Sequence, residues 1–279
     1  MILYEGEVYR LWDAHAHFSN IVARPLKFLL KKLAIYEIMD LIYANWKRFK
    51  RISEDRTEKN VFLFKLIMDF YHIDRAVNLP VFKLDRKLSY RMNKMMPDKM
   101  FGFGYIDPTS RKLEGDLQEL VESDVDGIKI HPDIMGFTFK KYESEILKIC
   151  EFCGENRIII LSHTGDHSEV KNLIPILKKC DETRFIMGHS GLQPQIDQAL
   201  DVARECPNSY LETSGNPYTY KFMEAINDPN IGVERILFGT DIPSLQPRVE
   251  IQKILALPIS ENEKSLIFSG NFENLLKVL

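Results

Sequence analysis

Two histidines stand one residue apart behind an aspartate in the segment WDAHAHF, residues 12–18. Side chains two residues apart in an extended strand point to the same face, so His15 and His17 would project side by side, and Asp13 would share that face. Two neutral imidazoles that converge on one point suit a borderline-soft cation such as zinc. The spacing therefore raises a metal site as a hypothesis, and a pair of half-buried strand histidines is the alternative.

More polar residues of this kind end later apolar runs of the chain. They are Lys129 and His131 in VDGIKIHP, His163 in RIIILSHTG, His189 in RFIMGHSG and Asp241 in RILFGTDIP. Five of the 7 histidines thus lie at the ends of apolar runs, which scattered core histidines would rarely do. This distribution favours the metal hypothesis, in which His15 and His17 are two ligands of a site whose other ligands come from residues far away in the sequence.

The runs that must position these residues number eight and alternate with helical patterns. They are VYRLWDAHAH, RAVNLPV, MFGFGYID, VDGIKIHP, RIIILSHTG, RFIMGHSG, NSYLETSG and RILFGTDIP. Alternating strands and helices predict a parallel sheet, and eight such units predict an α/β fold of the (β/α)8 TIM-barrel type, whose sites lie at the carboxyl ends of the strands. An open doubly wound sheet is the alternative, but no G-x-G-x-x-G follows the first run. We expect one domain over residues 1–279.

The connection between the first two runs, residues 19–74, is about twice as long as the others and has a helical period. In a barrel it leaves from the catalytic face, so we expect a helical, lid-like insertion. Its basic and aromatic character would also suit a membrane surface. Arg24 at its start is a candidate, with Lys129 and His131, for binding an anionic substrate.

The amino-acid composition limits the kinds of molecule that the protein is expected to bind. The 279 residues carry a net charge of −3, with 45% hydrophobic and 28% charged residues, as in soluble globular proteins. We expect a small-molecule substrate and neither a nucleic-acid nor a membrane partner, and a homodimer stays open. No secretory signal is evident, and cysteines that are free thiols predict a cytoplasmic, reducing location. We interpret the four cysteines, including the C-x-x-C of Cys150 and Cys153, as buried free thiols rather than a redox or zinc motif.

Two acidic residues after the fifth run are interpreted as the cap of a helix. Asp166 and Glu169 in DHSE are spaced like a helix N-cap and its reciprocal acid. We therefore interpret Asp166 as a cap rather than a catalytic group.

Together these motifs resemble the amidohydrolase superfamily. The segments WDAHAHF, HIDRAVNLP, GYIDP, GIKIHP, MGHSG, FGTDIP and FSGNFENLL are similar to its amidohydrolase-related branch, which includes aminocarboxymuconate semialdehyde decarboxylase and related hydrolases. The resemblance implies that His15, His17, His163 and Asp241 bind a divalent metal, and that His189 acts as acid or base or binds a second metal. We expect zinc, with manganese, iron and cobalt as alternatives.

The resemblance leaves metal count and reaction open. A strand-four lysine is carboxylated and bridges two metals in some relatives, whereas Lys129 as a free ammonium would bind a substrate carboxylate; we favour one metal. The leading hypothesis for the reaction is metal-assisted hydrolysis of an amide, lactone or ester, in which Asp241 takes the proton of water and His189 orients the water or protonates the leaving group. A metal-dependent decarboxylase is the alternative, and a catalytically silent binding protein is a third.

Overall fold

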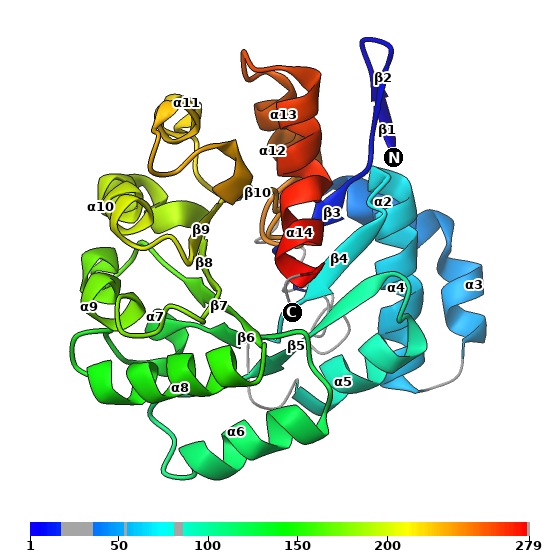
Figure 1. Ribbon diagram of the computed structural model, residues 1–279. Coiled ribbons are helices and arrows are strands. Elements are labelled where there is room, and N and C mark those ends of the chain that lie inside the picture. The colour runs from blue at the N-terminus through cyan, green and yellow to red at the C-terminus, as the bar shows by residue number, and fades with distance from the viewer. Residues whose placement is uncertain (18–35, 53–54, 81–85, 278–279) are drawn as a thin grey trace.

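Eight parallel strands form one sheet in chain order, surrounded by helices (Figure 1). The computed structural model describes residues 1–17, 36–52, 55–80 and 86–277. The strands are β3 (Trp12–Asp13), β4 (Arg75–Asn78), β5 (Met100–Tyr105), β6 (Gly127–Ile130), β7 (Ile159–His163), β8 (Phe185–Gly188), β9 (Ser209–Glu212) and β10 (Ile236–Leu237). Each predicted run contributes one strand to the eight-stranded sheet, so the predicted TIM-barrel fold is confirmed.

The sheet closes where the first barrel strand meets the last. Ala16 and Ile242 form a parallel bridge just beyond β3 and β10. On the other side of His15, the amide of Ala14 donates to the carbonyl of Phe238 over 2.9 Å. The two polar segments that follow β3 and β10 are thus held edge to edge, although more than 220 residues separate them in the sequence.

The first run differs from its prediction as a single strand. Its beginning belongs to an antiparallel hairpin, in which β1 (Ile2–Tyr4) pairs with β2 (Glu7–Tyr9), and only Trp12–Asp13 joins the barrel. The hairpin turns at Glu5 and Gly6, whose φ angles of 49° and 91° lie in the left-handed region that a tight two-residue turn requires.

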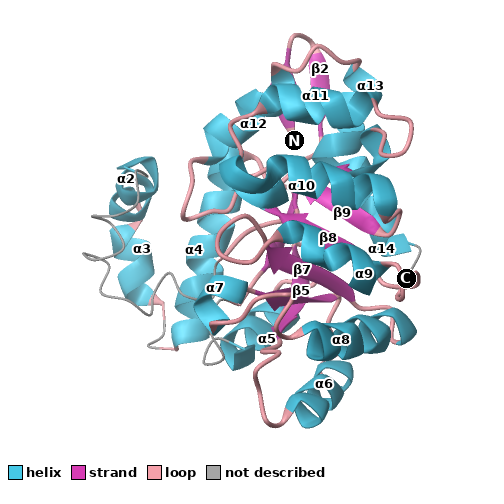
Figure 2. Cartoon of the chain, turned by 90° about the vertical axis from the view of Figure 1, so that its left-hand side faces the viewer, coloured by secondary structure: helices cyan, strands magenta, loops and turns pink. Residues whose placement is uncertain are grey.

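Three helices of the predicted insertion lie among the described residues. They are α2 (Tyr36–Ala44), α3 (Trp46–Arg51) and α4 (Arg56–Tyr71). Figure 2 shows α2 and α3 at one side of the molecule, beyond α4. Residues 18–35, which include Arg24, lie outside the described residues.

The other helices cover the barrel. They are α5 (Arg86–Met95), α6 (Leu113–Glu122), α7 (Pro132–Met135), α8 (Glu143–Glu155), α9 (Ile174–Leu177), α10 (Leu192–Glu205), α11 (Thr219–Asn227), α12 (Pro247–Leu255), α13 (Glu261–Ser265) and α14 (Asn271–Lys277), with the short helical segments η2 (Val170–Leu173), η3 (His189–Gly191), η4 (Val233–Arg235) and η5 (Leu266–Gly270).

Successive side chains of a strand point alternately into the barrel and outward to the helices, which gives an inner and an outer hydrophobic core. Ile159 and Leu161 of β7 pack in the barrel interior with Phe103 and Ile186, whereas Ile160 packs in the outer core with the helices. Phe272 of α14 joins the interior cluster. This apolar filling supports the strands from within and leaves their carboxyl ends to the polar residues.

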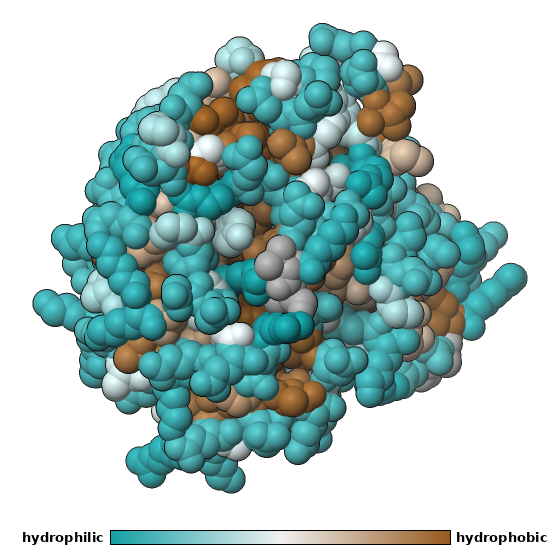
Figure 3. Space-filling model, viewed as in Figure 1, coloured by the Kyte–Doolittle hydropathy of each residue, from teal (hydrophilic) through white to brown (hydrophobic). Residues whose placement is uncertain are grey.

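The surface and the state of the cysteines agree with the expectations from the amino-acid composition. The face shown in Figure 3 is mainly hydrophilic. Cys150, Cys153, Cys180 and Cys206 are buried and form no disulfide, as predicted. Within the described ranges, no helix is both long enough and apolar enough to span a bilayer.

Candidate metal centre

The barrel closure brings the two histidines that follow the first barrel strand against the aspartate that follows the last. The amide of Asp241 donates to the carbonyl of His15, and the amide of His17 donates to the carbonyl of Ile242, each over 2.7 Å. Asp241 itself has a φ of 51°, a left-handed conformation that is uncommon for residues other than glycine. These backbone contacts fix the relative positions of the three side chains.

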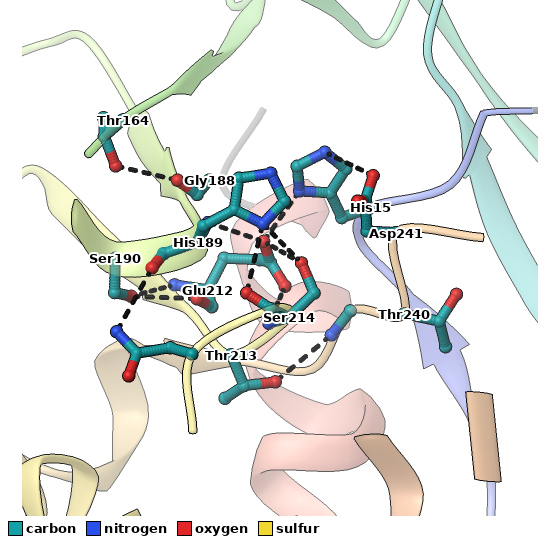
Figure 4. A network of polar contacts seen from close by, with 12 residues as sticks. His15, Thr164, Gly188, His189, Ser190, Glu212, Thr213, Ser214, Thr240 and Asp241 are labelled. Carbon is teal, nitrogen blue, oxygen red and sulfur yellow. Dashed lines mark hydrogen bonds and ion pairs between the residues drawn. The ribbon is translucent and has the colours of Figure 1, made fainter. Parts of the chain in front are cut away.

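The ligand atoms of these side chains converge on one point. The Nε2 atoms of His15 and His17 lie 3.2 Å apart. The Oδ1 atom of Asp241 lies 3.3 Å from Nε2 of His17 and 3.6 Å from Nε2 of His15. Figure 4 shows His15 and Asp241 facing each other. A cation placed among these atoms would meet two imidazole nitrogens and a carboxylate, a donor set suited to zinc, manganese or iron.

Hydrogen bonds outside the convergence point fix the tautomers of both rings. The Nδ1 atom of His15 lies 2.7 Å from Oε2 of Glu212, and Nδ1 of His17 lies 3.0 Å from the carbonyl oxygen of Leu79. Since carbonyl and carboxylate oxygens only accept, Nδ1 carries the hydrogen in each ring. The Nε2 lone pairs therefore point at each other and at Asp241, an arrangement that fits a bound cation.

Burial keeps the ring of His15 neutral. It lowers the pKa of His15 well below the usual value, and the charge of Lys129 lowers it further. Burial would raise the pKa of Asp241, but the neighbouring imidazoles and the charge of Lys129 outweigh it and lower this pKa. The centre therefore combines the neutral imidazole of His15 with the ionised carboxylate of Asp241, the protonation states in which both groups bind metals.

Glu212 at the end of β9 is a site residue that the sequence analysis missed. It is fully buried. Besides His15, its carboxylate accepts from the amide of His189 over 3.0 Å and from the amide and hydroxyl of Ser214 over 2.6 and 2.9 Å. The signal was present: Glu212 ends the apolar run SYLE just as the predicted site residues end theirs. Glu212 holds His15 in place, which the residue type alone does not reveal.

Lys129 lies inside the barrel beside the converging atoms. Its Nζ atom is 3.2 Å from Nε2 of His15, and the side chain is fully buried. Burial lowers the pKa of Lys129 to about 8, against the opposing effect of Asp241 and Glu212. A lysine with this pKa can exist as an ammonium or as an amine at physiological pH, so its position is compatible with both roles considered for it.

His189 follows β8 with a φ of 64°. Its Nδ1 atom lies 3.1 Å from the carbonyl oxygen of Ser214, and its ring centroid lies 4.4 Å from that of His15 and 4.8 Å from that of His163. Burial lowers the pKa of His189 to about 4. The ring is therefore neutral near pH 7, with the lone pair of Nε2 able to accept a hydrogen bond.

His163 and His131 lie beside this centre in a different arrangement. Their rings are stacked, with centroids 4.0 Å apart. The Nε2 atom of His163 faces Asp166 at 2.8 Å and Asp133 at 3.7 Å. Among the described residues, His131, Asp133 and His163 form a ligand group separate from that of His15, His17 and Asp241. Of the four predicted ligands, the structure thus brings three together and places the fourth alongside.

The interpretation of Asp166 as a helix cap is wrong. The next helical segment, η2, begins at Val170 after Glu169, and the Asp166 side chain bonds His163 instead. The spacing of DHSE matches a capping box, but the neighbouring imidazole competes for the carboxylate.

The chain matches known proteins over almost its whole length. A family model described as amidohydrolase matches residues 12–278. Among solved structures, an uncharacterized TIM-barrel protein from Bordetella bronchiseptica is 20% identical, with a TM-score of 0.72 over 96% of this chain and 98% of that chain. No curated protein sequence gives a significant match.

Several of the other similar solved structures are decarboxylases. A dihydroxybenzoic acid decarboxylase from a Polaromonas species, solved with manganese and 2-nitroresorcinol, is 16% identical, with a TM-score of 0.63 over 97% of this chain and 98% of that chain. A 5-carboxyvanillate decarboxylase from Sphingomonas paucimobilis is 13% identical, with a TM-score of 0.63 over 97% of this chain and 99% of that chain. At such identities the similarity shows the fold. The family match over residues 12–278, by contrast, shows that this chain belongs to the amidohydrolase family.

Proposed function

We propose that this protein is a metal-dependent hydrolase that cleaves an amide, lactone or ester bond of a small anionic substrate. The observation that carries the proposal is the convergence of Nε2 of His15, Nε2 of His17 and Oδ1 of Asp241 within 3.6 Å, with both Nδ1 atoms engaged elsewhere. His163 is the proposed fourth ligand. A divalent cation bound there would polarise the scissile carbonyl and lower the pKa of a water molecule toward about 7.

Asp241 is the proposed general base. Its lowered pKa keeps the carboxylate ionised at physiological pH, so that it can accept a proton. Its backbone is fixed by the hydrogen bond to His15, which limits the side chain to positions beside the two imidazoles. A positioned base of this kind contributes about 10²–10⁴-fold to rate.

His189 and Lys129 have proposed roles on either side of the base. Because Nδ1 of His189 donates to Ser214, its Nε2 lone pair can accept a hydrogen bond and orient the water. Lys129 offers a buried cation beside His15 that can pair with a carboxylate of the substrate. Arg24 and the insertion would complete substrate binding.

A decarboxylase is the second candidate, and two observations favour it. The dihydroxybenzoate and 5-carboxyvanillate enzymes with this fold are decarboxylases, and one of them was solved with manganese. In addition, a buried lysine beside the centre suits a substrate whose carboxylate lies next to the bond that breaks. In that reaction the substrate would lose carbon dioxide and gain a proton at the carbon that carried it, with His189 as the proposed proton carrier.

Product analysis in ¹⁸O-labelled water separates the two candidates. The protein, loaded with Zn²⁺ or Mn²⁺, is supplied with carboxylated lactones, esters and amides, and separately with hydroxybenzoic acids. A hydrolase gives a product with one ¹⁸O atom and releases no carbon dioxide. Carbon dioxide without uptake of water would instead establish the decarboxylase. In both assays Asp241→Asn is the matched inactive variant.

A further inference from the structure

Each of four histidines around the centre has one ring nitrogen fixed by an oxygen atom, but His163 uses the opposite nitrogen from the rest. His15, His17 and His189 engage Nδ1. His163 engages Nε2, which lies 2.8 Å from Oδ2 of Asp166. Within the described part of the chain, no hydrogen bond to Nδ1 of His163 is found. The nitrogen left with a lone pair for a ligand is therefore Nδ1 in His163, whereas it is Nε2 in the other three histidines.

The ring of His163 has little freedom to rotate. It stacks on His131 at an interplanar angle of 9° and meets the edge of His189 at 70°. Stacking on one side and an edge contact on the other fix the plane of the ring. What stays open is the placement of the ring hydrogen on Nε2 or on Nδ1. Asp166 and the more distant Asp133 both lie on the Nε2 side, where Asp166 is close enough to accept a hydrogen bond and Asp133, at 3.7 Å, adds negative charge.

The loop that carries Asp166 is fastened to the barrel. The side chain of Gln195 on α10 donates to the carbonyl of Asp166 over 2.7 Å and accepts from the amide of Val170 over 2.8 Å. Gly165 has a φ of 115°, and a Cβ atom there would lie 2.4 Å from the backbone of Gly191. The loop thus needs glycine at this close approach, and it places Asp166 by its backbone although the side chain is 44% exposed.

We propose that Asp166 is a positioning residue that fixes the ring hydrogen of His163 on Nε2, so that Nδ1 is the nitrogen with which His163 binds a cation. The tautomer stands independently of the proposed function, whereas its consequence for the cation rests on that function. A carboxylate that orients a metal-binding histidine in this way typically improves metal affinity by about 10–100-fold.

The tautomer is tested in metal-free protein by two-dimensional ¹⁵N–¹H NMR of ¹⁵N-histidine-labelled samples at pH 8, with His163 assigned from its loss in His163→Gln. The parent is expected to show hydrogen on Nε2 of His163, and Asp166→Ala to show a shift toward the other tautomer. Glu169→Ala removes an exposed carboxylate from the same loop and should leave the spectrum of His163 unchanged. Hydrogen on Nδ1 in the parent would overturn the inference, whether or not Asp166→Ala folds.

The consequence for the cation is tested by titrating the same metal-free proteins with Mn²⁺. Asp166→Ala should raise the Kd by about 10–100-fold, while Glu169→Ala should keep the Kd of the parent. A tautomer that changes without any change in Kd would overturn the positioning role. A parent that binds no Mn²⁺ or Zn²⁺ would contradict the proposed function and leave the NMR result to decide the tautomer.

Discussion

Nε2 of His15 and Nε2 of His17 lie 3.2 Å apart, and neither carries a hydrogen when its ring donates from Nδ1. Two lone pairs that face each other across this distance, with a carboxylate oxygen beside them, repel one another. A cation among them would replace this repulsion with attraction. The folded protein would then bind the metal far better than the unfolded chain does, which links metal binding to stability.

Metal should therefore raise the thermal stability of protein stripped with a chelator. At a free concentration of 100 Kd, Zn²⁺ or Mn²⁺ is expected to add about 2.7 kcal/mol, which corresponds to a Tm increase of about 5 °C for a chain of this size. Calcium, which prefers oxygen ligands, serves as the control and should change Tm far less. Equal shifts with Ca²⁺ and with Zn²⁺ would argue against an imidazole site.

Glu212→Gln should weaken metal binding, because the amide cannot satisfy His15, Ser214 and His189 at once. We expect a Kd about 10–100-fold higher and a loss of about 1–3 kcal/mol in the free energy of unfolding. Titration calorimetry and urea unfolding measure the two effects. Glu205→Gln, which removes an exposed carboxylate paired with Lys178, is the control. If the Glu212→Gln protein binds metal as tightly as the parent, Glu212 does not position His15 for metal binding.

Asp241→Asn keeps the shape of the side chain and removes its ability to take a proton. We expect kcat to fall by about 10²–10⁴-fold, with an unchanged circular-dichroism spectrum. Steady-state kinetics on the substrate identified by product analysis provide the measurement. A variant as active as the parent would show that another group is the base.

Lys129→Met separates the two metal counts while it keeps most of the buried volume. If the protein binds one metal, the metal content of the variant equals that of the parent. KM then rises by a factor that corresponds to about 1.5–3 kcal/mol, the contribution of a hydrogen bond to a charged group. Elemental analysis and kinetics give both quantities. Two metal equivalents in the parent that fall to one in Lys129→Met would instead establish a bridging lysine.

The sequence was sufficient for the barrel because strand alternation and helical periods are local signals. It also located His15, His17 and Asp241, because each ends an apolar run and all such ends meet at one face. It did not reveal Glu212 as the partner of His15 or Asp166 as the partner of His163, since hydrogen bonds between residues of different strands, or within an irregular loop, have no periodic signature. The hairpin at β1 and β2 was missed because a short run of strand residues does not indicate its partner.

Metal content of the His15→Ala/His17→Ala double variant is the most direct test of the proposed metal centre. Both variant and parent are purified without chelator, loaded with Zn²⁺ or Mn²⁺, desalted and measured by elemental analysis beside Glu205→Gln. We expect stoichiometric metal in the parent and in the control, and loss of most of the metal in the double variant, which should keep the fold. A folded double variant that holds metal as tightly as the parent would contradict the site built on His15, His17 and Asp241.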